Sequence, residues 1–269
     1  MLSQDEKIDI YSVAMALADV ARATILPLFR TGNLLTENKL SVGYDPVTAA
    51  DKSAEKAMRD ILALRRPDDA VLGEEYDATT GSSGLTWVLD PIDGTRGFIS
   101  GTPTWGVLIA VTDETGPLFG VIDQPFMGER FIGGFGWADY AGPHDKCKLT
   151  TRATTALSAV TLFTTFPEVG SDRDKAGFQA VASQVQLVRY GMDCYAYALL
   201  ALGQIDLVIE AGLNAYDIQA PIAVIQAAGG LVTDWQGQPA HSGGQALAAA
   251  NPACHQAALA LLRPFADPR

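Results

Sequence analysis

The stretch "WVLDPIDGTRGF", residues 87–98, decides how the rest of the chain is interpreted. Its bulky apolar side chains predict a buried strand, and Pro91, which has no N–H, is expected to end that strand at Asp90. Asp93 follows after one tight turn. Two carboxylates held this close repel each other unless a proton or a cation lies between them. The pair therefore indicates a cation site.

An anion site is predicted directly beside this cation site. Gly94 and Thr95 are placed to begin a helix, and the exposed N–H groups of a helix start attract anions. A metal-assisted phosphate site requires such a combination of cation and anion sites. Considered alone, however, the two aspartates could equally well cap a strand-to-helix turn.

Composition narrows the classes of protein. The 269 residues are 48% hydrophobic, which is enough for one large domain or two packed halves. A formal net charge of −12, with no cluster of lysines and arginines, makes nucleic acid and anionic membranes poor partners. No apolar run reaches about 18 residues, so we expect no bilayer span. The acidic, amphipathic N-terminus is typical of a first helix and not of a signal peptide, and we expect a cytoplasmic protein.

The cysteines and histidines exclude two kinds of metal site. The cysteines are odd in number, far apart and without a CxxC spacing, so neither a disulfide framework nor a thiolate zinc site is expected. The histidines show no HxxxH or HExxH spacing; these six residues are Cys147, Cys194, Cys254, His144, His241 and His255. Oxygen atoms must therefore bind any metal ion that this protein holds.

Hydrophobic periodicity predicts a mixed α and β chain. The expected helices are residues 5–30, a segment from about 47 to Pro67, and residues 174–185, 194–204, 216–230 and 254–262. The expected strands are residues 86–90, 105–111, 117–125, 128–136, 159–165, 206–212 and 231–235. The pattern changes near residue 150, which suggests a boundary between two halves.

Three further segments carry acids at turns and helix starts. "GEEY" contains Glu74, "AYDIQAP" contains Asp217, and "DPVTAAD" contains Thr48 and Asp51. Each acid alone is more readily explained as a solvated loop residue or a helix cap. Together, "DPVTAAD", "GEE", "WVLDPIDGT" and "YDIQAPIAVIQAAGG" run in this order through most of the chain, which resembles the inositol monophosphatase superfamily of metal-dependent phosphomonoesterases. "GVIDQPFMGERFIG" and "RYGMDCYAYALLALGQIDLVIEAGL" look most like its bacterial histidinol-phosphatase branch.

The resemblance implies a fold and an assembly. The expected fold is a layered α/β/α/β/α sandwich (α+β) of the inositol monophosphatase and fructose-1,6-bisphosphatase type, usually a homodimer. Residues 1–150 would form an α+β half with most metal ligands, and residues 151–269 an α/β half with Asp217 and substrate-binding residues. The two halves would make one compact catalytic unit with the site between them.

The resemblance also implies the site residues. Two or three Mg²⁺ ions, replaceable by Mn²⁺, would be bound by carboxylates and one main-chain carbonyl, which are the hard oxygen ligands that Mg²⁺ requires: Glu74, Asp90, Asp93, Asp217 and the carbonyl of Ile92. Asp51 and Thr95 match the water-activating pair, with Glu74 as a further catalytic residue, and Lys39 matches a lysine of the preceding loop. The reaction would be direct attack of a metal-activated water on a small phosphate monoester.

The predicted substrate is L-histidinol phosphate, in histidine biosynthesis. Its ammonium and imidazole groups call for acids away from the metals, and Asp193 and Glu210 are placed to supply them. The structural alternatives are that Asp193 caps a helix starting at Cys194 and that Glu210 is a solvated strand end. The remaining expected substrate contacts are the Gly94 and Thr95 amides, Arg96 and Arg189. An inositol-1-phosphate or other sugar-phosphate phosphatase is the alternative, and a non-catalytic metal-binding regulator is a remote one.

Overall fold

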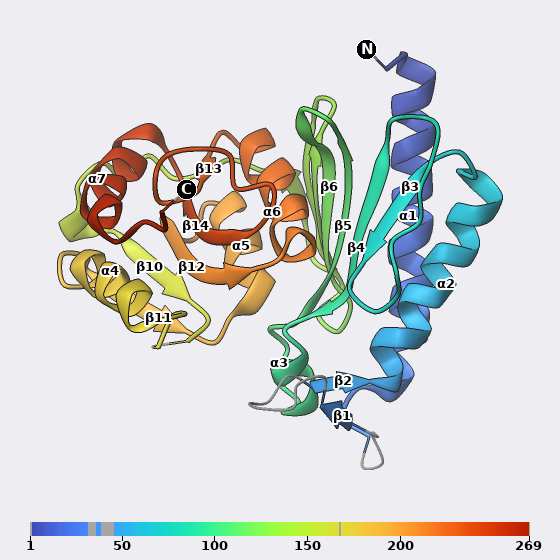
Figure 1. Cartoon of the computed structure of the whole chain (residues 1–269), viewed down its shortest axis with the longest axis horizontal. Helices are drawn as coiled ribbons and strands as arrows, with labels where there is room; N and C mark the ends of the chain where they lie inside the picture. Colours follow the sequence, from blue (N-terminus) through green and yellow to red (C-terminus); the bar gives the residue numbers. More distant parts are fainter. Residues whose placement is uncertain (1, 32–35, 39–45, 167, 269) are drawn as a thin grey trace.

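The computed structural model describes residues 2–31, 36–38, 46–166 and 168–268. Figure 1 shows five layers, which confirm the predicted α/β/α/β/α sandwich. They are, in order, the helices α1 (Gln4–Ile25) and α2 (Ala49–Arg65), a seven-stranded sheet, the helices α5 (Asp193–Ala201) and α6 (Ala215–Ala227), a five-stranded sheet, and the helices α4 (Asp172–Ala182) and α7 (Pro252–Leu262). The short helix α3 (Thr95–Ile99) extends from the lower end of the first sheet in this view.

The larger sheet belongs to the N-terminal half. Its strands lie in sequence order: β3 (Ala70–Gly73), β4 (Thr86–Asp93), β5 (Gly106–Asp113), β6 (Gly116–Gln124), β7 (Glu129–Gly134), β8 (Trp137–Ala141) and β9 (Lys146–Lys148). β3 pairs parallel with β4, and every other neighbour pairs antiparallel. Short hairpins therefore build most of this sheet, and the sequence predicted one of them, the pairing of residues 117–125 with residues 128–136.

The smaller sheet belongs to the C-terminal half, and its spatial order differs from its sequence order. It runs β11 (Leu187–Tyr190), β10 (Thr161–Thr164), β12 (Leu207–Leu213), β14 (Gly244–Ala249) and β13 (Leu231–Thr233). The first three strands are parallel, and β14 is antiparallel to both of its neighbours. The carboxyl ends of β10 and β12 consequently lie at the same edge, where ligands bind in open α/β sheets.

The remaining described elements are short. β1 (Thr36–Asn38) and β2 (Pro46–Thr48) pair antiparallel, and three 3-10 turns occupy Leu26–Leu28, Leu157–Ala159 and Arg263–Phe265. The first helix ends at Ile25 and not at residue 30 as predicted. Pro27 explains the difference, because a proline cannot donate the main-chain hydrogen bond that would continue an α-helix.

The segment Gln4–Leu28 is long and apolar enough, by length and composition alone, to cross a membrane. The segment passes on mean hydropathy and contains no uninterrupted apolar run of about 18 residues, and one such helix near the N-terminus is weak evidence of a membrane span. In the fold, α1 packs against α2 and β5, and the side chains of Ile10, Val13 and Leu17 are fully buried there. The apolar face of α1 is therefore part of the core.

The strand that carries the two aspartates continues further than predicted. β4 extends to Asp93, with a register shift between Asp90 and Asp93, which pairs with Gly106. Pro91 cannot donate to the ladder, so the chain bulges there instead of ending. The bulge keeps both aspartates at one end of β4, between β3 and β5.

Helix α6 lies between the two sheets and has buried residues on all sides, from Ile218 to Ile225. It approaches the larger sheet at two glycines. A Cβ atom on Gly120 would lie 2.5 Å from the carbonyl oxygen of Ala220, and one on Gly133 would lie 2.4 Å from the Cα of Val224. Only glycine permits this approach, which fixes the position of Asp217 at the start of the helix.

A buried carboxylate ties α1 to the sheet. Asp123 is fully buried at the end of β6 and accepts hydrogen bonds from Arg22 of α1, at 2.7 Å to Oδ1, and from Arg130 of β7, at 2.6 Å. Arg130 also contacts Asp19 at 2.8 Å. Two partners satisfy the buried charge, so removal of the charge would leave both arginines without their shared anion.

We expect Asp123→Asn to reduce the free energy of unfolding by roughly 3–5 kcal/mol, because it breaks a buried ion pair from one side. Urea unfolding followed by circular dichroism measures this change. The matched control is Asp60→Asn, which removes the exposed ion pair with Lys56 and should leave the midpoint unchanged. An equal loss in both variants would contradict the assigned role of Asp123.

Candidate active site

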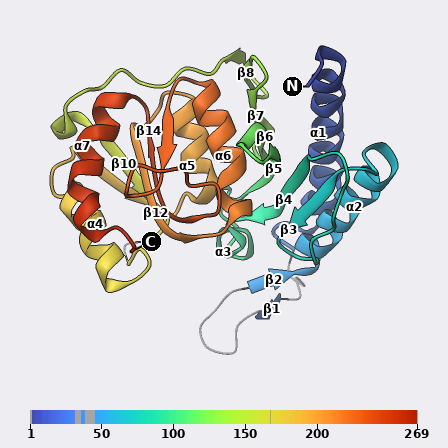
Figure 2. The ribbon, with the colours of Figure 1, turned by 45° about the horizontal axis from the view of Figure 1, so that its top comes forward.

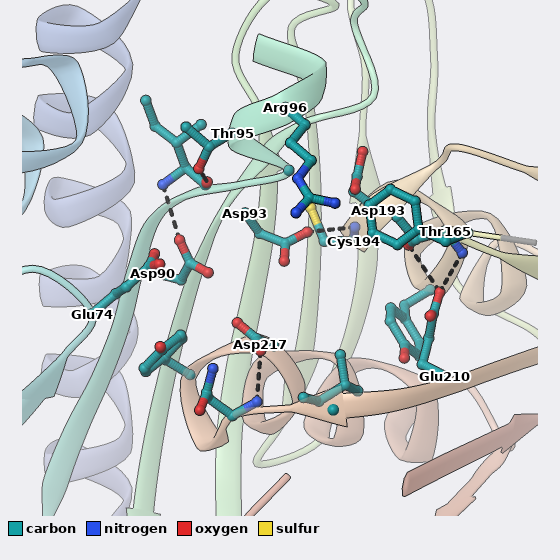
Figure 3. A pocket seen from close by; sticks show the side chains of 18 of the residues that line it. Glu74, Asp90, Asp93, Thr95, Arg96, Thr165, Asp193, Cys194, Glu210 and Asp217 are labelled. Atoms are coloured by element: carbon teal, nitrogen blue, oxygen red, sulfur yellow. Dashed lines mark hydrogen bonds between the residues drawn. The ribbon is translucent and has the colours of Figure 1, made fainter. Parts of the chain in front are cut away.

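A cavity of about 280 Å³ lies between the two halves. Its walls come from β4 and α3 on one side, and from the ends of β10 and β12 and the starts of α5 and α6 on the other (Figure 3). It brings together ten residues that the sequence predicted for the site: Glu74, Asp90, Ile92, Asp93, Gly94, Thr95, Arg96, Asp193, Glu210 and Asp217. Figure 2, a view turned by 45°, shows α3 and the start of α6 at the same junction.

Three carboxylates form a compact group, here called the carboxylate cluster: one oxygen atom from each of Asp90, Asp93 and Asp217 lies within 4.8 Å of the others. A main-chain N–H orients each of them. Ile92 donates to Asp90 at 3.0 Å, Cys194 to Asp93 at 2.6 Å, and Asn214 to Asp217 at 2.6 Å. Rigid main-chain groups from both halves therefore hold the cluster in place.

The electrostatics of the cluster favour a cation. Burial raises the pKa of Asp90 well above its usual range, and the charges of Glu74, Asp93 and Asp217 raise it further. Burial also raises the pKa of Asp93, and Asp193 and Asp217 add to the effect. These carboxyl groups cannot all be ionised unless a cation lies between them. Their hard oxygen atoms fit a divalent cation such as Mg²⁺.

The loop that carries Glu74 is anchored by a residue that the sequence reasoning missed. Glu55 of α2 is fully buried, accepts a hydrogen bond from the Glu75 N–H at 2.7 Å, and pairs with Arg59 at 2.8 Å. A Cβ atom on Gly73 would lie 1.9 Å from a Glu55 oxygen, so a side chain there would displace the Glu55 carboxylate from its position. The signal in the sequence was an acid on the apolar face of a helix, four residues before an arginine.

Asp51 and Thr95 lie next to each other, as the resemblance implied. Asp51 is fully buried and forms a capping box at the start of α2, accepting hydrogen bonds from the Thr48 N–H and hydroxyl at 2.9 and 2.5 Å. The Thr95 hydroxyl lies 3.4 Å from the other Asp51 oxygen and 3.1 Å from the carbonyl oxygen of Ile92. This hydroxyl therefore connects a buried carboxylate with the edge of the cavity.

Asp193 and Glu210, here called the acid pair, lie on the far side of Asp93 from Glu74 and Asp90 (Figure 3). Asp193 is not the cap of α5, because Met192 holds that position; its φ of +46° is in the left-handed region, and the Thr104 hydroxyl lies 3.4 Å from its carboxylate. Burial raises its pKa to about 6. A non-glycine residue in this conformation often marks a functional position.

Glu210 ends the buried part of β12. It accepts hydrogen bonds from the Thr165 N–H at 2.6 Å, the Thr165 hydroxyl at 2.9 Å and the Thr164 hydroxyl at 3.2 Å. Burial raises its pKa to about 7 in spite of these donors. Glu210 is thus not a solvated strand end.

Two predicted residues lie elsewhere. Arg189 is exposed on β11 and does not line the cavity, and Lys39 lies outside the described residues. Several lining residues were not foreseen: Thr165, Phe166, Tyr197 and Tyr216 among them. Among the described residues, the buried Tyr197 hydroxyl has no hydrogen-bond partner, and the only signal for Phe166 was its place after a predicted strand.

A five-layered fold with carboxylates between its halves defines the class of metal-dependent phosphatases. The chain belongs to the inositol monophosphatase family, whose model matches residues 6–265. It is 41% identical over 240 residues to the bifunctional phosphatase IMPL2 of Arabidopsis thaliana, covering 88% of this chain and 67% of that protein. It is 34% identical to the histidinol-phosphatase of Mycobacterium tuberculosis, covering 88% and 91%. An inositol monophosphatase structure from Zymomonas mobilis is 36% identical, with a TM-score of 0.82 and coverage of 97% and 99%.

We expect the stability of the metal-free protein to fall as the pH rises from about 4.5 to about 7, because Glu210 ionises at 4.5 when unfolded but at about 7 when folded. The contribution of Glu210 to the free energy of unfolding is complete below its pKa in the unfolded chain and is lost above its pKa in the folded protein. The total change is up to about 3 kcal/mol. Thermal unfolding at several pH values, without divalent cations, measures this dependence.

Glu210→Gln should make that pH dependence less steep, because glutamine carries no charge in either state. A smaller fall should remain, because the pKa values of Asp90, Asp93 and Asp193 are also raised in the folded protein. The control is Glu114→Gln, at an exposed turn position, which should leave the profile unchanged. A Glu210→Gln profile as steep as that of the unmodified protein would contradict the burial of this acid.

Proposed function

We propose that this protein is a Mg²⁺-dependent phosphomonoesterase that hydrolyses L-histidinol phosphate to L-histidinol and phosphate, a step of histidine biosynthesis. The observation that carries the proposal is the acid pair, held in the same cavity as the carboxylate cluster but on its opposite side. The likeness to the Mycobacterium tuberculosis histidinol-phosphatase supports it. We also propose that the protein acts as a homodimer.

The residues would divide the work of hydrolysis among them. The carboxylate cluster, with Glu74 and the Ile92 carbonyl, would hold the cations. Bound Mg²⁺ would neutralise charge on the phosphate and lower the pKa of a water molecule. The main-chain N–H groups of Gly94 and Thr95 would hold phosphate oxygens.

Proton uptake would fall to Thr95 and Asp51. The Thr95 hydroxyl lies within reach of both the Asp51 carboxylate and the cavity. A hydroxyl can receive a proton from the attacking water while it donates its own to a neighbouring carboxylate. Because Asp51 is buried and fixed by Thr48, its orientation needs no change during the reaction.

The acid pair favours histidinol phosphate over inositol phosphate. The leaving group of histidinol phosphate carries an ammonium and an imidazole, whereas inositol offers only neutral hydroxyls. Placing two buried acids beside a neutral ligand would cost free energy that a cationic ligand recovers. Inositol-1-phosphate remains the alternative substrate, because the similar Zymomonas mobilis structure is an inositol monophosphatase.

Hydrolysis should stop when the metal is removed, and Asp93→Asn should reduce kcat by at least ~10²-fold, in line with the loss of a preorganised electrostatic group. Mg²⁺ should raise the melting temperature of the unmodified protein, because it binds the folded state alone. Phosphate release with and without EDTA, together with thermal unfolding, measures both effects. Asp139→Asn, in a surface ion pair with Lys148, is the control. Full activity in EDTA would refute the metal-dependent reaction.

Asp193→Asn tests the substrate. A charge-assisted hydrogen bond is worth roughly 1.5–3 kcal/mol, so we expect kcat/KM toward histidinol phosphate to fall about 10- to 100-fold. The rate on phenyl phosphate, which has no cationic group, should change little. Equal losses on both esters, or faster turnover of inositol-1-phosphate by the unmodified protein, would overturn the histidinol assignment and leave the phosphatase assignment standing.

A further inference from the structure

Phe166 is an exposed aromatic side chain in the wall of the cavity. Seven large apolar side chains are exposed in the described part of the chain, and Phe166, 41% exposed, is the one among them that lines the cavity. It follows Thr165, whose N–H and hydroxyl bind Glu210. The ring is therefore attached to the segment that fixes one member of the acid pair, and exposed aromatic side chains in a pocket are typical of ligand contacts.

Arg96 holds the ring from the other half of the protein. The guanidinium carbon of Arg96 lies 4.8 Å from the centroid of the Phe166 ring, which is within the range of a cation–π interaction. Arg96 belongs to α3 and Phe166 follows β10, so the pair connects the two halves at the cavity. Figure 3 shows the guanidinium beside Asp193.

The part of the cavity around Phe166 and Asp193 suits a ligand that has a planar ring with a polar edge. An aromatic face attracts another ring by stacking or edge-to-face contact. The carboxylate of Asp193 can accept an N–H from the edge of such a ring, since the Thr104 hydroxyl contacts one of its two oxygens. The puckered inositol ring, with a hydroxyl on every carbon, would gain little from an aromatic face.

We propose that Phe166 determines substrate specificity by packing against the imidazole ring of the leaving group, while Asp193 accepts the imidazole N–H. This inference rests on the proposed function, because it assigns the part of the cavity that recognises the ring of histidinol phosphate. The phosphate would lie at the carboxylate cluster and the ring at Phe166. Arg96 would position the phenyl ring and would not need to bind phosphate.

The experiment compares two esters that differ only in the ring. Histidinol phosphate carries the imidazole, and 2-aminopropyl phosphate has the same amino alcohol core with a hydrogen atom in its place. Phe166→Leu, which keeps apolar bulk but loses the aromatic face, should lower kcat/KM for histidinol phosphate roughly 3- to 10-fold, mainly through KM. The same variant should act on 2-aminopropyl phosphate within about twofold of the unmodified protein, because this ester never contacts the ring. Phe166→Tyr, which restores the face, should recover the preference for histidinol phosphate.

A matched control exists elsewhere on the surface. Phe126 is 45% exposed and also has a guanidinium over its ring, that of Arg30 at 4.4 Å, but it does not line the cavity. Phe126→Leu should leave both rates unchanged. A Phe166→Leu protein that keeps its full preference for histidinol phosphate would overturn the inference alone. A change of oligomeric state in the Phe166→Leu protein, measured by gel filtration, would also overturn the inference, because the ring would then lie in a subunit interface. An unmodified protein that hydrolyses both esters equally would also overturn the inference, because the imidazole would then gain nothing from the cavity. An unmodified protein that hydrolyses neither ester, or that hydrolyses inositol-1-phosphate faster, would instead refute the proposed function on which the inference rests.

Discussion

The mutual repulsion of buried carboxylates is the constraint on which the rest of the structure depends. Asp90 is 1% exposed in β4, with Asp93 and Asp217 close enough to share one ion. Such a group destabilises a fold unless protons or cations neutralise it. The protein retains it, with a main-chain N–H bound to each acid. A site of this kind is explained by a ligand that the acids bind, and not by its contribution to stability.

The two halves are joined so that the acids meet. The bulge at Pro91 keeps two aspartates on one strand, and two glycines of the same sheet let α6 approach closely enough to add the third. The buried Glu55 holds the loop of Glu74 from behind. The carboxyl ends of β10 and β12 supply the opposite wall, where the acid pair and Phe166 lie. We therefore assign metal binding to β4 and the start of α6, and substrate recognition to the start of α5 and the ends of β10 and β12.

Much of this arrangement could be predicted from the sequence, because local signals coincided with it. The apolar runs predicted a mixed α and β chain, and the "DPIDGT" motif indicated a cation site. The family resemblance that the motifs carry implied the correct layers and most of the ten residues that meet in one cavity. Contacts between distant segments could not be predicted. Nothing in the sequence indicates that Glu55 binds the Glu75 N–H or that Arg96 packs on Phe166. Short strands such as β8, β11 and β14 were missed because pairing with neighbours, more than local propensity, makes them strands.

The central claim is that the carboxylate cluster exists to bind divalent cations. Anomalous X-ray scattering from crystals grown with Mn²⁺, an ion expected to replace Mg²⁺, tests it directly. We predict an anomalous peak between Asp90, Asp93 and Asp217, and its loss in crystals of the Asp93→Asn variant. Fully occupied Mn²⁺ sites elsewhere on the chain, with none between these three carboxylates, would contradict the account.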